Sequence, residues 1–241
     1  MINKIEQSGQ NYSIVRFWAS PNYRDRPAIA KLQVPKEDKM ILHDFLPSGN
    51  GYKIRLLLTL LGKPFDLVEY DITKGETRTP EFISRINANG KIPALELGDG
   101  HILTESNAIL IHLAEGTPYL PADVWQRTEV MQWLFFEQYD HEPTIAVLRA
   151  WVAIKGMPEH ADILVPMKQA GAKKALEFME KRLSDHDWLV ADGLSIADIS
   201  LYAYTHVAEE GHIDLSVYPG IMAWMDRISA LPGYIPITMK P

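Results

Sequence analysis

The sequence predicts a two-part fold, an α/β unit with the element order βαβαββα followed by an all-helical unit. Three observations support this prediction. Apolar stretches with strand character alternate with amphipathic helices from residue 40 to residue 116. An Asp-Gly pair at residues 99–100 separates two apolar stretches, which indicates a hairpin. Strand signals vanish after Pro121, and the later segments have helical spacing.

The α/β unit begins with a β-α-β pattern. Residues 41–46 suit a short strand, and Pro-Ser-Gly-Asn-Gly at residues 47–51 is typical of a turn. A helix is expected next, because apolar side chains recur at helical spacing at Ile54, Leu57, Leu58 and Leu61. Gly62 and Pro64 should end this helix before a second strand at residues 65–70.

The remaining elements follow from similar signals. We expect a short helix near residues 80–86, hairpin strands at 92–97 and 101–103, and a helix that opens at 104–107 and ends at Ala114. In the helical unit, a long helix should run from Trp125 to Trp151 with a kink at Pro143. Ser195 and Asp198 have the spacing of a capping box, which indicates a role in folding.

We divide the chain into an N-terminal extension at 1–39, the α/β unit at 40–116, a linker at 117–121 and the helical unit at 122–241. The extension carries seven basic and four acidic residues, whereas residues 40–241 carry 17 basic and 27 acidic residues. The extension is a targeting segment, a flexible arm or the product of an upstream start codon, and we assign it no function.

Composition excludes several classes of function. The net charge of −7 argues against a nucleic-acid partner, because phosphate binding requires a basic face. No apolar run is long enough for a membrane span, and the first residues lack the layout of a signal peptide, so we expect a cytoplasmic protein. The chain has no cysteine, which excludes disulfides, thiolate metal sites and a protein thiol as nucleophile.

Common catalytic and nucleotide-binding motifs are absent from the sequence. Two Gly-x-Gly sequences, at 49–51 and 98–100, lack the third glycine of a dinucleotide loop, and no Gly-Lys-Ser/Thr triplet exists. The histidines include no His-Glu-x-x-His, so no metal is expected, and no Gly-x-Ser-x-Gly elbow occurs.

Four remaining motifs resemble those of the cytosolic glutathione transferases. They are Pro-Ser-Gly-Asn-Gly-Tyr-Lys-Ile at 47–54, Asn-Gly-Lys-Ile-Pro-Ala-Leu at 89–95, Leu-Thr-Glu-Ser-Asn-Ala-Ile at 103–109, and the segments 187–189 and 195–198 of the helical unit. They occur in the family's order over residues 40–235. The pair Ser48 and Asn50 is most similar to the bacterial Nu class, whose members have Thr-x-Asn there. The resemblance implies a thioredoxin-like first domain and a homodimer.

By this resemblance, Ser48 and Asn50 would stabilise the thiolate of glutathione. A cysteinyl thiol has an ordinary pKa of about 8.5, so only about 3% is ionised at pH 7. Lowering that pKa by ~2 units raises the ionised fraction to roughly three quarters and requires ~2.7 kcal/mol. The Ser48 hydroxyl, the Asn50 amide and the start of the following helix could supply it. Alternatively, Ser48 or Asn50 only caps that helix.

The rest of glutathione would occupy the other motifs. By the resemblance, Glu105 meets the γ-glutamyl ammonium, the Ser106 hydroxyl and amide meet its carboxylate, and the Ile92 backbone pairs with the cysteinyl part. Lys91 would lie near the glycyl end, with Pro93 cis, and Lys53 would approach the same ligand or remain a solvated lysine. Without the other motifs, Glu105 and Ser106 could be an ordinary helix start.

The resemblance also implies an electrophile pocket lined by inward residues of the first long helix of the second domain. The candidates are Phe136, Tyr139, His141 and Arg149, although aromatic residues at this spacing are also typical of a core. The leading hypothesis is conjugation of glutathione to a small electrophile. The alternatives are reduction of disulfides or peroxides with two glutathiones, and a regulatory or scaffold protein without catalysis.

Overall fold

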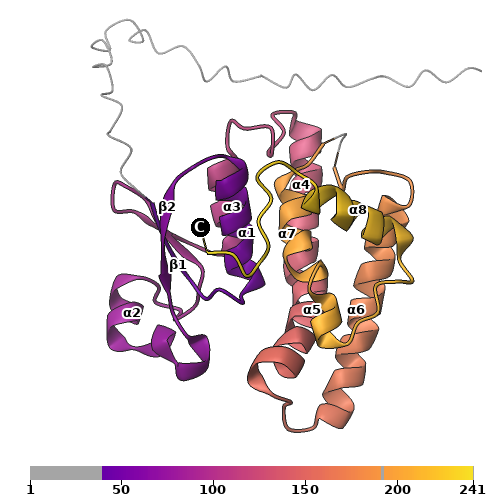
Figure 1. Cartoon of the computed structure of the whole chain (residues 1–241), viewed down its shortest axis with the longest axis horizontal. Helices are drawn as coiled ribbons and strands as arrows, with labels where there is room; N and C mark the ends of the chain where they lie inside the picture. Colours follow the sequence, from indigo (N-terminus) through magenta and orange to yellow (C-terminus); the bar gives the residue numbers. More distant parts are fainter. Residues whose placement is uncertain (1–39, 191–192, 241) are drawn as a thin grey trace, which may run out of the picture. The chain divides into compact units, whose positions relative to one another are not determined.

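The computed structural model describes residues 40–190 and 193–240. The predicted extension at 1–39 lies outside these residues. The described residues cluster as one compact unit. Within its described part, strands occur only in the first half, and the second half is helical (Figure 1).

The first half is built on a mixed sheet with the strand order β2-β1-β3-β4. The strands are β1 (Met40–Asp44), β2 (Phe65–Glu69), β3 (Ala94–Glu96) and β4 (Ile102–Thr104). β2 pairs parallel to β1, whereas β3 runs antiparallel to β1 and β4. A parallel pair requires a crossover, and helix α1 (Gly49–Leu60) provides it.

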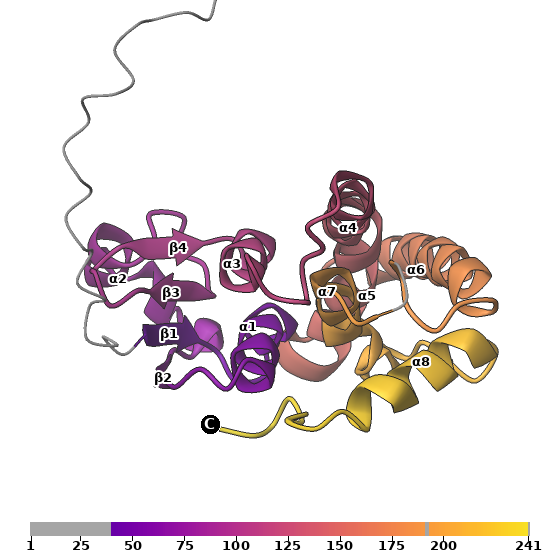
Figure 2. The same cartoon turned by 90° about the horizontal axis from the view of Figure 1, so that it is seen from above.

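Helices cover both faces of the sheet. Helices α1 and α3 (Ser106–Ala114) pack together on the face toward the helical half, and α2 (Pro80–Arg85) lies on the opposite face (Figure 2). Two 3₁₀ turns, η1 (Ile72–Lys74) and η2 (Glu76–Arg78), lead into α2. This order and topology confirm the predicted thioredoxin-like α/β fold.

The second half is arranged around α7 (Ile196–Thr205), whose residues are all buried. This helix contacts α1, α3, α4 (Val124–Phe136) and α5 (Glu142–Arg149). The remaining elements are α6 (Ala161–Leu183), the 3₁₀ turn η5 (Ala208–Gly211) and α8 (Pro219–Ser229). The predicted all-helical second domain is therefore confirmed.

The helix predicted at 125–151 is interrupted in a way that the sequence did not indicate. Between α4 and α5 lies a π-helical turn, η3 (Glu137–His141), and a second one, η4 (Ala150–Lys155), follows α5. Pro143 has no N–H to donate, and the wider turn directly precedes it. Because a π-helical turn contains an additional residue, it changes which side chains of the next helix face the first half.

The start of α7 is held by the predicted capping box. The Ser195 hydroxyl accepts from the Ala197 N–H, and the buried Asp198 carboxylate accepts from the Ser195 N–H. Asp198 also accepts from the Leu189 N–H and the Trp224 indole N–H, 2.9 and 3.0 Å away. The capping residue therefore also ties α8 to α7, which confirms its role in folding.

The last residues of the chain return from the helical half to α1 (Figure 2). The Tyr52 hydroxyl donates to the Ile235 carbonyl at 2.7 Å. The buried Arg55 guanidinium donates to the Ile237 and Met239 carbonyls at 2.8 and 3.2 Å. This C-terminal segment, residues 234–240, therefore fastens the two halves together. Among the described helices, none has the length and apolar character of a membrane span.

Candidate functional site

The loop between β1 and α1 is the centre of the candidate site. Ser48 is the N-cap of α1, and its Oγ accepts from the Gly51 N–H at 3.4 Å. The first turn of α1 packs directly on the buried Asp44 carboxylate, since a Cβ at Gly51 would lie 1.6 Å from the nearer Asp44 oxygen. Only glycine therefore fits at residue 51.

Two buried arginines hold this loop by its carbonyl groups. Arg55 donates to the Leu46 carbonyl at 2.6 Å and is itself anchored on Asp44 at 3.0 Å. Arg149, on α5, donates to the Pro47 carbonyl at 2.6 Å and is anchored on Glu210 at 2.8 Å. The two residues before Ser48 are thus fixed from α1 and from the helical half.

A buried ion pair lies beneath the loop. Lys53 Nζ and Glu137 Oε1 are 2.8 Å apart, and neither side chain is exposed. Burial is the largest influence on Glu137 and would raise its pKa, but the charge and hydrogen bond of Lys53, together with His141 and Gln138, hold that pKa below its ordinary value. Glu137 also accepts from the amides of Asn107 and Gln138 at 3.0 and 2.9 Å. The pair therefore joins α1, α3 and η3.

Hydrogen bonds connect this ion pair to Asn50. Lys53 Nζ donates to Ser106 Oγ at 3.3 Å, and the Ser106 hydroxyl donates to Asn50 Oδ1 at 3.0 Å. Asn50 Nδ2 donates to Glu142 Oε1 at 2.7 Å. The Ser106 hydroxyl is therefore occupied as donor and as acceptor, and the Asn50 amide has a fixed orientation with one N–H left over.

Next to Asn50 lies a cavity of about 230 Å³, called here the polar pocket. Its lining comes from the α1 start, the segment before β3, the α3 start and η3 with α5: Asn50, Asn87, Lys91, Ile92, Pro93, Glu105, Ser106, Gln138 and Glu142. The structure brings together every predicted glutathione contact except Lys53, which lies in the buried network below. Helix α3 begins here, so its first backbone N–H groups are available to an anion.

The backbone of this pocket has two unusual conformations. The Ile92–Pro93 peptide is cis, as expected. Glu105 has a φ of 67°, in a region that non-glycine residues rarely adopt and that costs ~1–3 kcal/mol. Such strain is typical of functional sites, and here it sits on an exposed carboxylate at the pocket edge.

A second cavity, of about 290 Å³, adjoins the first and is called here the apolar pocket. The two share Gln138 and Glu142. The apolar pocket is lined by Phe45, Pro47, Ser48, Ile72, Pro143, Ala146, Val147, Arg149, Ala150, Ile154, Lys155 and Tyr204 besides the shared pair. Ser48 thus lies in one pocket and Asn50 in the other, two residues apart.

Tyr204 reaches this loop from α7. Its ring packs on Gly49, where a Cβ would lie 2.6 Å from the ring, and its hydroxyl interacts with the Ser48 side chain. Burial, with the charges of Glu142 and Glu137, raises the pKa of this phenol, so it stays protonated.

The predicted electrophile contacts are distributed differently. Arg149 lines the apolar pocket, but its guanidinium is engaged by Pro47 and Glu210. Phe136 and Tyr139 instead line a separate cavity beside α6. His141 is fully buried and hydrogen-bonded to Thr205 Oγ1 at 2.9 Å. The structure therefore does not bring Phe136, Tyr139 or His141 to the pocket beside Ser48.

The site residues that sequence reasoning missed include Gln138, Glu142, Tyr204 and Asn87. Gln138 and Glu142 are polar and four residues apart, so they share one face of a helix, and Glu142 directly precedes Pro143. This spacing is the sequence signal that could have identified them. Tyr204 lies within an apolar helix and has no such signal. Asn87 donates to the Lys91 carbonyl at 2.9 Å. It lies in a loop, where no helix or strand period shows which way a side chain points.

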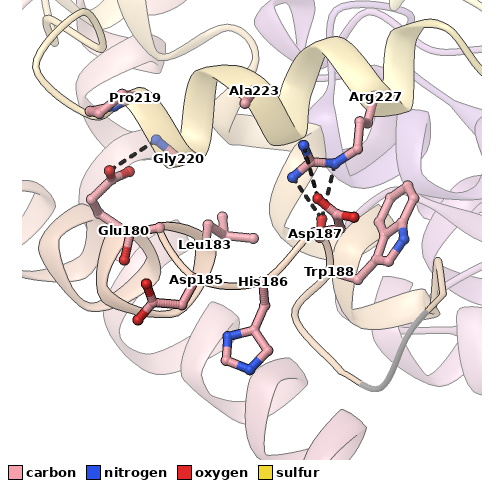
Figure 3. Close-up of a pocket in the computed structure, with 11 residues that line it drawn as sticks. Glu180, Leu183, Asp185, His186, Asp187, Trp188, Pro219, Gly220, Ala223 and Arg227 are labelled. Carbon is pink, nitrogen blue, oxygen red and sulfur yellow. Dashed lines mark hydrogen bonds and ion pairs between the residues drawn. The ribbon is translucent and has the colours of Figure 1, made fainter.

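A larger cavity, of about 640 Å³, lies far along the chain from these residues, between α6, the following loop and α8 (Figure 3). Its polar groups serve the fold. The Glu180 carboxylate accepts from the Gly220 N–H at the start of α8, and Arg227 donates to the Asp187 carbonyl (Figure 3). Glu180 also accepts from the Ile221 N–H. No group of potential metal ligands occurs among the described residues.

Comparisons with known proteins agree with this geometry. The family description "Glutathione S-transferase, N-terminal domain" matches residues 38–115, and "Glutathione S-transferase, C-terminal domain" matches residues 144–232. The chain belongs to the glutathione S-transferase family. These two matches cover the sheet, most of the helical half and every residue of the polar pocket except Gln138 and Glu142, which lie between them.

Individual relatives match about four fifths of this chain. The chain is 31% identical over 196 residues to the disulfide-bond oxidoreductase YfcG of Escherichia coli, covering 78% of this chain and 90% of that one. A glutathione S-transferase structure from Pseudomonas fluorescens is 50% identical with a TM-score of 0.79, covering 82% and 98%. Ure2p in complex with glutathione is 25% identical with a TM-score of 0.75, covering 82% and 97%. Structures homologous to this glutathione S-transferase family protein therefore bind glutathione.

The buried His141 makes stability depend on pH. Burial lowers its pKa to about 4, whereas the unfolded chain takes up this proton near 6.5. The unfolded state therefore binds more protons below pH 6.5, and the folded state loses about 2 kcal/mol between pH 7 and pH 5 from this group. Urea unfolding of His141→Gln should show a correspondingly weaker pH dependence. An unchanged dependence, or the same change in the exposed control His186→Gln, would contradict this assignment.

Proposed function

We propose that this protein is a glutathione transferase that binds glutathione in the polar pocket and joins its sulfur to a small electrophile in the apolar pocket. The observation that carries the proposal is that four segments distant in sequence surround one polar pocket, which adjoins an apolar one at Ser48 and Asn50. The Ser-x-Asn pair favours a place near the bacterial Nu class.

Ser48 and Asn50 are proposed to stabilise the thiolate. The Ser48 hydroxyl and the remaining N–H of Asn50 are donors at the start of α1, where the helix dipole also favours an anion. The buried network fixes the amide orientation in advance, so no ordering is needed when sulfur arrives.

The ends of glutathione are proposed to bind as the resemblance implies, with one change. Glu105 lies at the pocket edge for the γ-glutamyl ammonium, and Lys91 for the glycyl carboxylate. The Ser106 hydroxyl is occupied by Lys53 and Asn50, so its backbone N–H is the group left for the γ-glutamyl carboxylate. Lys53 acts beneath the site as a positioning residue.

A second candidate function is the reduction of small disulfides with two glutathiones. It is favoured by the similarity to a protein named as a disulfide-bond oxidoreductase and by the absence of cysteine from this chain, which leaves glutathione as the source of thiols. A regulatory role without catalysis remains the alternative to both.

Removing either donor should weaken the thiolate. Ser48→Ala and Asn50→Ala should each raise the pKa of the bound thiol by ~1–2 units, because a hydrogen bond to a charged group is worth about 1.5–3 kcal/mol. Thiolate absorbance near 240 nm, titrated against pH, measures this. Ser84→Ala, on the surface of α2, is the control. Identical titrations in both variants and the wild type would refute these roles.

Calorimetry and a substrate panel separate the candidate functions. Conjugation predicts one glutathione per chain and turnover of an aryl halide, whereas disulfide reduction predicts two per chain and turnover of hydroxyethyl disulfide. Binding without turnover of either substrate class would favour the regulatory alternative. No heat of glutathione binding at several temperatures would refute both enzymatic proposals.

The homodimer is also proposed. Helix α4 exposes Val124, Trp125 and Phe135 by 71–79%, which is an apolar surface that a second copy could cover. Light scattering should give twice 27.3 kDa. A mass of 27.3 kDa would refute the dimer, and charged substitutions at Trp125 and Phe135 should shift the protein toward that mass.

A further inference from the structure

Glu142 occupies the boundary between the two pockets. It lines both, and its side chain is 24% exposed. Oε1 accepts from Asn50 Nδ2 at 2.7 Å, and Oε2 accepts from Gln138 Nε2 at 2.8 Å. The carboxylate is therefore held in one orientation and is accessible from both sides.

This position puts the carboxylate close to the proposed sulfur site. Asn50 Nδ2 carries two hydrogens, and one of them is directed at Glu142. A sulfur that accepts the other hydrogen lies roughly 5 Å from the carboxylate oxygen, given ordinary hydrogen-bond lengths. A small rotation of Glu142 or one bridging water spans that distance.

The charges around Glu142 do not favour an ionised Glu142 beside a glutathione thiolate. Lys53 is 3.8 Å from Glu142, but it is only 2.8 Å from the buried Glu137, which balances its charge. Glu137 also acts on Glu142 directly, since its charge and a side-chain hydrogen bond raise the pKa of Glu142, and the neutral amides of Asn50 and Gln138 and the protonated Tyr204 lie beside it. A thiolate and an ionised Glu142 would therefore leave two uncompensated negative charges, so one proton should be retained between them.

We propose that Glu142 is the general base and acid of this site, receiving the proton of the bound thiol and delivering it to the leaving group in the apolar pocket. The inference rests on the proposed function, because it requires glutathione in the polar pocket. It goes beyond that function by stating where the thiol proton goes.

The step balances for either substrate. The S–H bond breaks and an O–H bond forms on Glu142, so sulfur keeps the electron pair. For a disulfide, this sulfur bonds to one sulfur of the substrate, the S–S bond breaks, and the departing thiolate takes the proton from Glu142. For an aryl halide, the C–S bond forms, halide leaves with its electron pair, and the proton passes to solvent. In each case the carboxylate is restored.

The ionisation of Glu142 is consistent with this role. Burial raises its pKa above the ordinary value, and the charge of Glu137 adds to the effect, while Lys53 and the Asn50 amide oppose it. A carboxylate with a raised pKa accepts a proton more readily near neutral pH, and an additional negative charge on sulfur strengthens the tendency.

Proton release on glutathione binding tests the inference directly. Wild-type protein, Glu142→Gln and the charge-matched control Glu209→Gln, an exposed residue of η5, are mixed with glutathione at pH 7 in weak buffer. A pH dye measures the protons released, and absorbance near 240 nm measures the thiolate formed. In wild type and Glu209→Gln, fewer than about 0.3 protons should be released per thiolate. In Glu142→Gln, the ratio should rise toward one.

Other outcomes are also decisive. A release of about one proton per thiolate in the wild type overturns the inference, even if the variant fails to fold. The inference is also overturned if Glu142→Gln releases the same number of protons per thiolate as the wild type.

Turnover gives a second readout. Glu142→Gln should lose about 10²-fold in kcat with hydroxyethyl disulfide, whose alkylthiolate leaving group needs a proton, and distinctly less with an aryl chloride, because chloride does not. Equal losses on both substrates would contradict proton delivery.

Failure of the inference is distinguishable from failure of the proposed function. If calorimetry shows that the wild-type protein binds no glutathione, both the proposed function and the role of Glu142 are rejected. If it binds glutathione and turns over either substrate while releasing one proton per thiolate, the proposed function stands and only the role of Glu142 is rejected.

Discussion

The buried ion pair between Lys53 and Glu137 is the interaction on which the site depends. Two fully buried charges are costly to remove from water, and they are stable only where each is paired and hydrogen-bonded. Here each partner comes from a different half of the protein, so the ionic contact forms only when the halves are docked. Hydrogen bonds extend from this ion pair to Ser106, Asn107 and Asn50. The ion pair therefore also fixes the positions of the pocket residues Ser106 and Asn50.

The loop with Ser48 is also held by buried charged side chains that are paired with opposite charges. Its backbone carbonyls at Leu46 and Pro47 are bound by guanidinium groups rather than by neighbouring backbone, so the loop needs no regular structure to be rigid. Each arginine is in turn neutralised by a carboxylate, Asp44 or Glu210. The glycines on either side of Asn50 permit the close approach of Tyr204 and Asp44. A short segment is thereby held from the sheet, from α1 and from the helical half together.

Local patterns were sufficient to predict the order of strands and helices, whereas the thioredoxin-like fold and the part of the site that was predicted came from the family resemblance. Strand and helix periods, the Asp-Gly turn and the Ser195 capping box depend on nearby residues, so they can be inferred from the sequence. Lys53 has the local sequence of a solvated helix residue, and only its partner 84 residues away shows that it is buried. Gln138 and Glu142 face the pockets, whereas Tyr139 lines the separate cavity beside α6, and only the packing of η3 and α5 against the rest of the structure shows this difference.

The C-terminal segment has a consequence for how the protein is made. Arg55 and Tyr52 are buried in the first half, but their hydrogen-bond acceptors are carbonyls of the last seven residues before Pro241. During synthesis the chain emerges from its N-terminus, and the ribosome still encloses those residues when α1 is already free to pack. The donors of Tyr52 and Arg55 therefore meet these acceptors only after residues 235–239 have left the ribosome, so the first half reaches its final structure late in folding.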